Sequence, residues 1–333
     1  MSEWQEQPPP DELAPFLHGA FVMASDEDAV PDVYDVAIVG GGPAGLSAAL
    51  WLSRYLHTVA VIDSGDPRNW ETRGINGIIG SQGIRSPELR EHGRRDASSF
   101  GAELIDDLVT TISNTNSERF ELTLKNGAGI GTRRVLLAIG IKDIWPGIPG
   151  LGDCYGETAH VCPDCDGFET RNCKTVVVGS GRKAVGMALN LTTWTDHIVI
   201  CTNGEPADMT QAYLDKLKAL NIPVLEAKIT SITSRNGEIR CMDLEGGMQL
   251  DCERLYFAIG QYPADDLGVQ LKCERDEGGH IVVDDKYRTT VLNVFAAGDI
   301  TPGPQLAISA AAEGAIAALA IHASLVPDSR KLD

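Results

Sequence analysis

The sequence predicts an α/β fold of two Rossmann-like domains, with the second domain inserted into the first. Two segments share the order strand, glycine turn, helix and strand, which is the building unit of nucleotide-binding folds. Two Ala-Ile-Gly segments, 138–140 and 258–260, each close an apolar strand and bracket the second of these units. We therefore expect a discontinuous first domain at 33–142 and 263–325, with the second domain at 143–262 between its two parts.

The elements of both units follow from local sequence patterns. A β-rich apolar run leads into each glycine turn, an alanine- and leucine-rich helix follows, and another apolar strand closes the unit. The expected elements are a strand at 33–39, a turn at 40–45, a helix to 52 and a strand at 59–62, then a strand at 175–178, a turn at 179–181, a helix at 184–191 and a strand at 198–200. Towards the C-terminus, the segment 294–299 precedes a helix expected over 305–323.

The first glycine turn has the sequence of a dinucleotide-binding turn. Gly40 permits the tight turn, Gly42 lets backbone amides approach a pyrophosphate, and Gly45 allows close packing of the helix on the strand. The helix N-terminus, which begins at Pro43 and Ala44, then presents its free backbone N–H groups, from Ala44 onward, to the phosphates. Asp63 ends the following strand, where it is placed to hydrogen-bond a ribose diol. These residues together predict a bound dinucleotide.

A cysteine pair precedes the second glycine turn, in the segment Cys162-Pro163-Asp164-Cys165-Asp166-Gly167. Two thiols at this spacing can close a small disulfide ring that is readily reduced. The neighbouring carboxylate of Asp166 can move protons as the ring opens. Cys154 and Cys173 flank the pair, but the segment lacks the second C-x-x-C or Cys/His pair of a zinc site, so we predict no metal.

Charge and composition narrow the classes of partner. The formal net charge of −19 and a pI of about 4.7 argue against nucleic acid or an anionic membrane as partner. Residues 1–32 carry eight acidic residues and no Lys or Arg, so we expect an acidic N-terminal arm, and residues 326–333 a tail. Because an acidic N-terminus does not suit a secretory signal, we expect a cytoplasmic protein. The apolar stretch 306–326 contains Glu313, which favours a core helix over a membrane span.

The motifs together resemble the low-molecular-weight thioredoxin reductase family of FAD/NAD-linked flavoproteins. The segments VGGGPAG, CPDCDG, the two AIG segments and VFAAGD occur in that family's order, and the resemblance covers about residues 33–325. It implies that the first domain holds FAD and that the chain forms a homodimer. The residues predicted to contact FAD are Gly40, Gly42, Pro43, Ala44, Gly45, Asp63, Asn76, Gly140, Gly298, Asp299 and Gln305.

The resemblance also assigns roles at the cysteine pair. Cys165 lies against the flavin, Cys162 attacks the disulfide of a thioredoxin-like or other partner, and Asp166 is the acid/base residue. This division agrees with the chemistry, since reduced flavin delivers two electrons to the disulfide and leaves one thiol free for exchange.

The second glycine turn departs from the family pattern. Gly179-x-Gly181-x-x-Ala184 has the geometry of the turn, but the arginine cluster that pairs with the 2′-phosphate of NADPH is missing. No Lys or Arg occurs between Lys183 and Lys216. Because an arginine–phosphate contact contributes a few kcal/mol, we predict that NADPH is not the electron donor. A second FAD in its place is an open alternative.

Three functions remain open at this point. The favoured one is an FAD-dependent dithiol/disulfide oxidoreductase that takes electrons from a ferredoxin-like donor, since Asp166 after the second cysteine is typical of reductases. The second is an oxygen-dependent oxidase of small-molecule dithiols, which His160 keeps open. The third is a flavin-binding redox sensor without turnover. For an acidic electron donor, the expected docking site is a basic cluster on the predicted first domain. The cluster consists of Arg85, Arg90, His92, Arg94 and Arg95.

Overall fold

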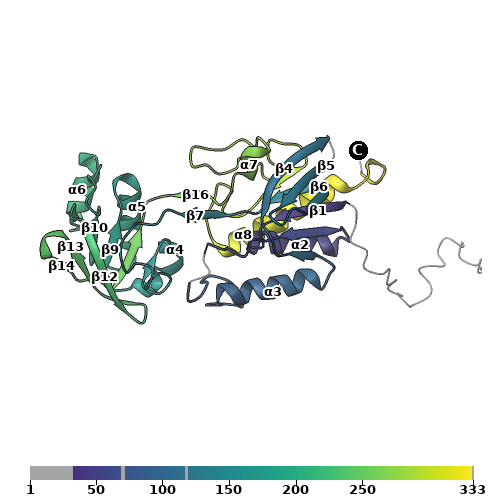
Figure 1. Ribbon diagram of the computed structural model, residues 1–333. Coiled ribbons are helices and arrows are strands. Elements are labelled where there is room, and N and C mark those ends of the chain that lie inside the picture. The colour runs from purple at the N-terminus through teal and green to yellow at the C-terminus, as the bar shows by residue number, and fades with distance from the viewer. Residues whose placement is uncertain (1–32, 69–71, 117–118, 332–333) are drawn as a thin grey trace, which may run out of the picture. The chain divides into compact units, whose positions relative to one another are not determined.

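The computed structural model describes residues 33–68, 72–116 and 119–331 (Figure 1). The predicted acidic arm, 1–32, lies outside the described residues, as do the last two residues of the predicted tail. The α/β fold with parallel Rossmann-like sheets is confirmed. The domain boundaries remain a prediction.

The first sheet joins strands from two distant parts of the sequence. Its strand order is β3-β2-β1-β6-β5-β4, with β17 paired to β6. Strands β2, β1, β6, β17 and β3 run parallel, whereas β4, β5 and β6 form an antiparallel meander. The strands are β1 (Tyr34–Val39), β2 (Val59–Ile62), β3 (Glu103–Ile105), β4 (Val109–Asn116), β5 (Arg119–Leu124), β6 (Gly129–Leu137) and β17 (Val294–Ala296). Strand β17 therefore returns to the sheet that begins the chain's described part.

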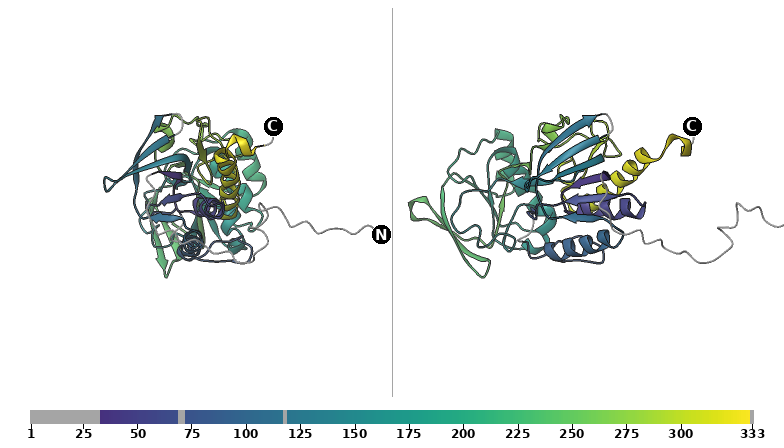
Figure 2. Two further views of the ribbon diagram at one scale, coloured as in Figure 1. Left: turned by 90° about the vertical axis from the view of Figure 1, so that its right-hand side faces the viewer. Right: turned by 45° about the vertical axis from the view of Figure 1, so that its right-hand side comes forward.

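Helices cover the first sheet, and two of them pack unusually closely. The helices are α2 (Pro43–Arg54), α3 (Ser86–Ser98), the short α7 (Leu267–Gln270), α8 (Ala307–Leu325) and the 3-10 turn η4 (Asp328–Arg330). Figures 1 and 2 show α2 lying between α3 and α8. A Cβ added at Gly314 would overlap the carbonyl oxygen of Ala44, so α8 approaches α2 at backbone distance. Small residues at this crossing are what permit that approach.

Helix α8 has a composition that also suits a membrane span. Among the described helices, α8 is the one that is long and apolar enough to cross a bilayer, judged by length and composition. Its buried face, however, includes Ala310, Ala317 and Ile321, which belong to the same core as α2 and β1. This burial is expected of a core helix, in line with the interpretation of Glu313 above.

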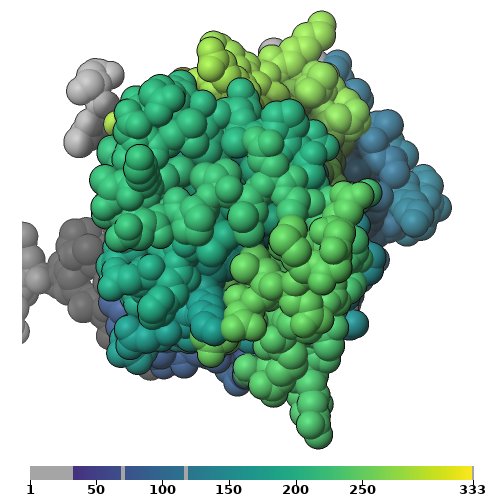
Figure 3. Space-filling view, turned by 90° about the vertical axis from the view of Figure 1, so that its left-hand side faces the viewer, coloured from purple at the N-terminus to yellow at the C-terminus, as the bar shows by residue number. Residues whose placement is uncertain are grey.

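The second sheet is wholly parallel, with the order β11-β10-β9-β15-β8. Its strands are β8 (Ala159–His160), β9 (Thr175–Val178), β10 (Ile198–Cys201), β11 (Val224–Leu225) and β15 (Arg254–Phe257). The accompanying helices are α4 (Pro163–Asp166), α5 (Gly181–Leu191), α6 (Gln211–Ala219), η2 (Phe168–Thr170) and η3 (Glu245–Gly247). A small antiparallel sheet is formed by β12 (Ile229–Arg235), β13 (Glu238–Leu244) and β14 (Gln249–Leu250). Figure 3 looks onto the surface that these teal and green segments form.

A two-stranded ribbon joins the two large sheets. Strand β7 (Ile141–Asp143) follows β6, and β16 (Gln261–Pro263) follows β15. The two strands pair antiparallel, with Gln261 opposite Asp143 (Figure 1). Both predicted crossings of the chain, near 142 and 263, fall in this ribbon.

Candidate functional site

The first glycine turn is fixed by the chain's own packing at Gly40 and Gly45 and is open at Gly42. An added Cβ at Gly40 would overlap the carbonyl oxygen of Ala138, and one at Gly45 would overlap that of Gly40. Gly40 also has a φ of +109°, which favours glycine. By contrast, an added Cβ at Gly42 would meet no atom within 4 Å. Gly42 is therefore the point at which the turn is free to meet a ligand.

The N-terminus of α2 lies beside this opening. No side chain caps the helix, so its first N–H groups keep their hydrogen-bonding capacity for an outside acceptor. Such a terminus also carries the positive end of the helix dipole, which favours a phosphate. The open glycine and the uncapped helix together fit the pyrophosphate of FAD.

One cavity of about 240 Å³ gathers nearly all the predicted site residues. It is lined by the FAD-contacting set apart from Gly45, which packs under the turn, and by the cysteine pair with its acid. The members are Gly40, Gly42, Pro43, Ala44, Asp63, Asn76, Gly140, Gly298, Asp299, Gln305, Cys162, Cys165 and Asp166. Residues separated by more than two hundred positions in the sequence thus border a single space.

Asp63, predicted to bind a ribose diol, already has protein partners. Its Oδ2 accepts a hydrogen bond from Arg90 Nε at 2.9 Å, and Arg94 lies 3.6 Å away. The same oxygen lies so close to Gly41 that a Cβ there would overlap it. Arg90 and Arg94 are two members of the predicted basic cluster. A ribose hydroxyl at Asp63 would therefore have to share the carboxylate with Arg90.

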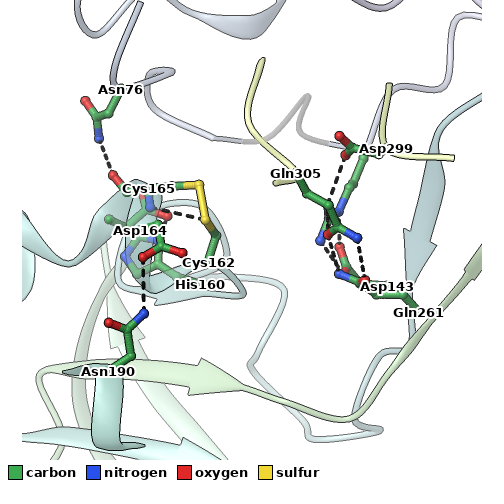
Figure 4. Close-up of a disulfide and its surroundings, with 12 residues drawn as sticks. Asn76, Asp143, His160, Cys162, Asp164, Cys165, Asn190, Gln261, Asp299 and Gln305 are labelled. Atoms are coloured by element: carbon green, nitrogen blue, oxygen red, sulfur yellow. Dashed lines mark hydrogen bonds and ion pairs between the residues drawn. A yellow bond between two sulfur atoms is a disulfide. The ribbon is translucent and has the colours of Figure 1, made fainter. Parts of the chain in front are cut away.

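Cys162 and Cys165 form a disulfide at the start of α4 (Figure 4). The Sγ of Cys162 accepts a hydrogen bond from the backbone N–H of Cys165 at 3.1 Å. Asn76, from the loop before α3, donates from Nδ2 to the carbonyl oxygen of Cys165 at 3.0 Å. Gln82 holds Asn76 in turn, through a bond of 2.7 Å to its Oδ1. The amide of Asn76 therefore ties the disulfide to the wall of the cavity that contains the first glycine turn.

The flanking cysteines do not join the pair. The thiol of Cys154 donates to the carbonyl oxygen of Leu151 at 3.2 Å, and that of Cys173 lies 3.6 Å from the carbonyl oxygen of Arg171. Within the described ranges, no three His, Cys, Asp or Glu side chains cluster in a way that could hold a metal ion. Cys154 and Cys173 thus have backbone partners of their own, apart from the pair.

Asp166 has the electrostatics of a proton donor. Burial, with the nearby Glu169 adding to it, raises the pKa of Asp166 to about 7. A carboxyl group with this pKa can both give and take a proton near neutral pH. His160 lies beside it, with Nδ1 at 3.4 Å from Asp166 Oδ2.

Sequence reasoning missed Arg68, which ties the cavity to the ribbon between the sheets. Its guanidinium donates to both carboxylate oxygens of Asp143, each at 2.7 Å, and to Asp299 at 3.1 Å. Gln305 and Gln261 complete the network through side-chain bonds of 3.0 Å (Figure 4). Burial raises the pKa of Asp299 even though Arg68 acts in the opposite direction. An arginine after a strand carries no local sign that it will be enclosed.

Glu313 is a second residue whose role the sequence did not reveal. From the middle of α8 it accepts the backbone N–H of Gly298 at 2.7 Å and the hydroxyl of Thr301 at 3.1 Å. Burial raises the pKa of Glu313. A single carboxylate in an alanine-rich helix was a possible signal, because burying it requires partners such as these.

The second glycine turn is covered by the chain itself. The N–H of Gly181, at the start of α5, donates to the carbonyl oxygen of Ala207 at 2.8 Å. Glu226 holds that loop by accepting the N–H of Ala207 at 3.0 Å. The carboxylate of Asp208 lies beside the turn, with Oδ2 at 3.6 Å from the position of a Cβ on Gly181. The backbone N–H of Gly181 is thus already bonded within the chain, and the Asp208 carboxylate lies beside the turn.

Comparison with known proteins shows the family to which the chain belongs. Residues 34–314 match the family model described as pyridine nucleotide-disulphide oxidoreductase. The chain is 32% identical over 304 residues to thioredoxin reductase of Treponema pallidum, a match that covers 86% of this chain and 95% of that protein. It is 29% identical over 324 residues to a probable thioredoxin reductase of Arthroderma benhamiae, which covers 88% of this chain and 80% of that protein.

Solved structures show the same similarity. A putative thioredoxin reductase, TrxB, from Bacillus anthracis aligns with a TM-score of 0.82 at 29% identity, over 88% of this chain and 98% of the other. The crystal structure of HlmI aligns with a TM-score of 0.84 at 31% identity, over 90% of this chain and 94% of the other. With the disulfide and the dinucleotide cavity side by side, these matches show that the chain belongs to the pyridine nucleotide-disulphide oxidoreductase family, as a thioredoxin reductase-like flavin disulfide oxidoreductase that uses FAD.

Proposed function

We propose that this chain passes electrons from a donor other than NADPH, by way of FAD, to the Cys162–Cys165 disulfide and on to a protein disulfide. The observation that carries the proposal is the second glycine turn, whose backbone is already hydrogen-bonded within the chain. The Gly181 N–H that would face a pyrophosphate is already bonded to Ala207, and the carboxylate of Asp208 would repel the phosphates.

The end of β10 supports the same conclusion. A nicotinamide dinucleotide places its adenosine ribose here, and the 2′-phosphate of NADPH needs a cation. Cys201 and Thr202 occupy this position, both buried, and the thiol of Cys201 donates to the carbonyl oxygen of Ala227 at 3.3 Å. The nearest carboxylates in the loop, Glu205 and Asp208, have the wrong charge for a phosphate. Without a bidentate cation, binding loses a few kcal/mol, or about two orders of magnitude in affinity.

The reaction at the cysteine pair needs two electrons and a proton donor. FAD, when bound, supplies the two-electron carrier. The two electrons break the S–S bond and leave two thiolates, and Asp166 gives its proton to one of them and becomes a carboxylate. The bond from the Cys165 N–H helps to hold the negative charge on the sulfur of Cys162.

Transfer to a partner follows by thiol–disulfide exchange. The Cys162 thiolate attacks a sulfur of the partner's disulfide, which forms a mixed disulfide and releases one partner thiolate. Cys165, which holds the proton that Asp166 gave, returns it to the Asp166 carboxylate and attacks Cys162, so that the internal disulfide forms again and the second partner thiolate leaves. Two electrons have moved, and the partner's thiolates take their protons from solvent or from Asp166.

The donor is tested directly on the purified yellow protein. Without oxygen, the flavin absorbance is followed after addition of NADPH, NADH or chemically reduced ferredoxin, each at equal concentration. We expect rapid bleaching by reduced ferredoxin and slow or no bleaching by either nicotinamide. Rapid bleaching by micromolar NADPH would overturn the proposal. The ratio of flavin to chain in the same preparation shows whether a second FAD binds.

His160 favours a second candidate, an oxygen-dependent oxidase of small-molecule dithiols. An imidazole 3.4 Å from Asp166 could take part in removing a proton from an incoming thiol. Peroxide formation from a dithiol in air would support this function, and inertness toward both dithiols and all electron donors would support a redox sensor. Sedimentation of the same sample tests the homodimer that the resemblance predicts.

A further inference from the structure

His160 is held beside the cysteine pair by the second sheet. It ends β8, two residues before Cys162, and its register partner on β15 is Tyr256. The two rings lie 5.4 Å apart between centroids. The residue is only 6% exposed, and its Nδ1 is 3.4 Å from Oδ2 of Asp166. Strand pairing thus fixes an imidazole against Asp166, which lines the same cavity as Cys162 and Cys165.

The burial of the other ring nitrogen of His160, Nε2, needs an explanation. Within the described residues, Nε2 of His160 is sealed from solvent and makes no hydrogen bond. An unpaired buried polar atom costs on the order of 1–3 kcal/mol, which an apolar side chain of similar size would avoid. The ring nitrogen that faces a polar group is Nδ1, at 3.4 Å from Asp166 Oδ2.

The charged and titratable groups around His160 keep it neutral. Asp166 on α4 and Tyr256 on β15 face it directly, Arg254 adds positive charge from β15, and Glu169 of η2 lies beyond Asp166. Burial, with Arg254 adding to it, lowers the pKa of His160 to about 3. Since the pKa of Asp166 is about 7, the proton that the pair shares between these two values resides on Asp166.

We infer that His160 is a positioning residue for Asp166: from 3.4 Å its neutral ring offers an Nδ1–H that closes into a hydrogen bond with Oδ2 as Asp166 ionises, which leaves the transferable proton on Oδ1. The tautomer with the proton on Nδ1 leaves Nε2 as a bare acceptor, which agrees with its lack of a partner. When Asp166 gives its Oδ1 proton to a thiolate, the same Nδ1–H stabilises the new carboxylate. No proton or electron moves to His160 in this step.

The inference rests on the acid role proposed for Asp166 and is independent of the electron donor. Its test therefore uses chain that has been reduced with dithiothreitol and desalted. The rate of exchange with an aromatic disulfide is measured between pH 5 and 9, in His160→Leu, His160→Asn, and Asp166→Asn. The exposed His197→Asn variant is the matched control.

In the wild type we expect a pH step near 7 that Asp166→Asn removes. In the reduced chain the Asp166 carboxylate takes the proton of the attacking thiol, so the rate should rise through this step. His160→Leu removes the donor to the carboxylate, so the step should move up by about one unit and the rate at pH 7 should fall about fivefold. The amide of His160→Asn can replace Nδ1–H and should restore most of the profile. An unchanged step in His160→Leu would overturn the inference, whereas an unchanged profile in Asp166→Asn would instead remove the acid role on which it rests.

A measurement on the unmodified chain covers the case in which the variants fail to fold. The ¹⁵N shifts of the His160 ring report its tautomer and protonation state. A neutral ring with the proton on Nδ1 at pH 6 is expected. A proton on Nε2 alone, or a doubly protonated ring, would overturn the inference.

Discussion

At the scale of single residues, burial decides what Asp166 can do. Its sequence neighbour Asp164 is exposed and bonds Asn190 on α5, whereas Asp166 lies in the cavity and has a pKa of about 7. The motif predicted both the cysteine pair and its acid, because their spacing is local. It could not predict the contacts of Asp166 with His160, or of Asp63 with Arg90, because these partners come from elements that only the fold brings together.

The raised pKa of Asp166 makes stability depend on pH. The folded chain holds this proton up to about pH 7, whereas the unfolded chain releases it near pH 4, so stability falls as pH rises between these values. Asp166→Asn should abolish that loss of stability. The loss is at most about 4 kcal/mol, and solvent screening reduces it because the Asp166 side chain is 21% exposed. We expect the variant to be more stable than wild type at pH 8 and equal to it at pH 4 in urea unfolding. An exposed control, Asp196→Asn, should show no such difference.

The two cysteines should differ in their effect on the flavin spectrum. If Cys165 lies against the flavin, its thiolate forms a charge-transfer band in the Cys162→Ser variant after reduction. The band should be absent from Cys165→Ser. Equal bands in both variants would show that the roles assigned to the two sulfurs are wrong.

At the scale of elements, local pattern predicts strands and turns well and long-range closure poorly. Strands β2 and β9 have the predicted bounds, and α8 is shifted by two residues, to Ala307–Leu325. The loop that covers the second glycine turn gave no sequence signal, since its bond from Gly181 to Ala207 spans a strand and depends on Glu226 from beyond α6. The missing arginines led to the prediction of a donor other than NADPH, whereas the bond between Gly181 and Ala207 is visible only in the fold.

Two glycines beside helix α2, Gly42 and Gly314, should respond differently to an added methyl group. Gly42→Ala meets open space, so the flavin-free chain should keep its stability within about 0.5 kcal/mol while flavin binding falls at least about tenfold. Gly314→Ala overlaps the carbonyl oxygen of Ala44 and should destabilise the flavin-free chain by about 1–3 kcal/mol. Unfolding curves and flavin titrations separate the two effects. Full flavin affinity in Gly42→Ala would contradict the open-turn interpretation.

At the scale of the whole molecule, Arg68 connects the cofactor cavity to the ribbon between the sheets. Its side chain is 18% exposed and lies between two carboxylates, Asp143 on β7 and Asp299 after β17. The sequence predicted that the chain crosses between two units near 142 and 263, because the Ala-Ile-Gly segments mark the strand ends. It could not predict that Arg68, which lies outside the ribbon, would form ion pairs with both Asp143 and Asp299.

Breaking this network should be costly because it leaves buried charge unpaired. Arg68→Gln should lower the free energy of unfolding by about 3 kcal/mol, and adding Asp143→Asn should recover part of the loss. The neighbouring pair of Lys142 with Asp66 is more exposed, so Lys142→Gln should cost less than about 1 kcal/mol. Equal losses in Arg68→Gln and Lys142→Gln, measured by urea unfolding, would contradict the assignment.

Docking of an acidic donor also belongs to this scale. Two arginines of the predicted cluster are held by Asp63 and Asp106, which leaves Arg85 and Arg95 as its exposed members. Reversing both to Glu should slow ferredoxin-driven reduction on the order of tenfold at low salt. The matched control reverses Arg235 and Arg240, which are exposed on β12 and β13. Equal rates of ferredoxin-driven reduction in the two double variants would show that the donor does not dock at Arg85 and Arg95.

The bond between Gly298 and Glu313 has a consequence for how the protein is made. The cavity opens at the turn after β1 but is completed by an aspartate at 299 and by the carboxylate on α8 that holds the preceding glycine. A ribosome must therefore release residue 313 before the pocket can close around a coenzyme. We therefore expect flavin to bind late in biosynthesis, and nascent chains halted before α8 to carry no flavin.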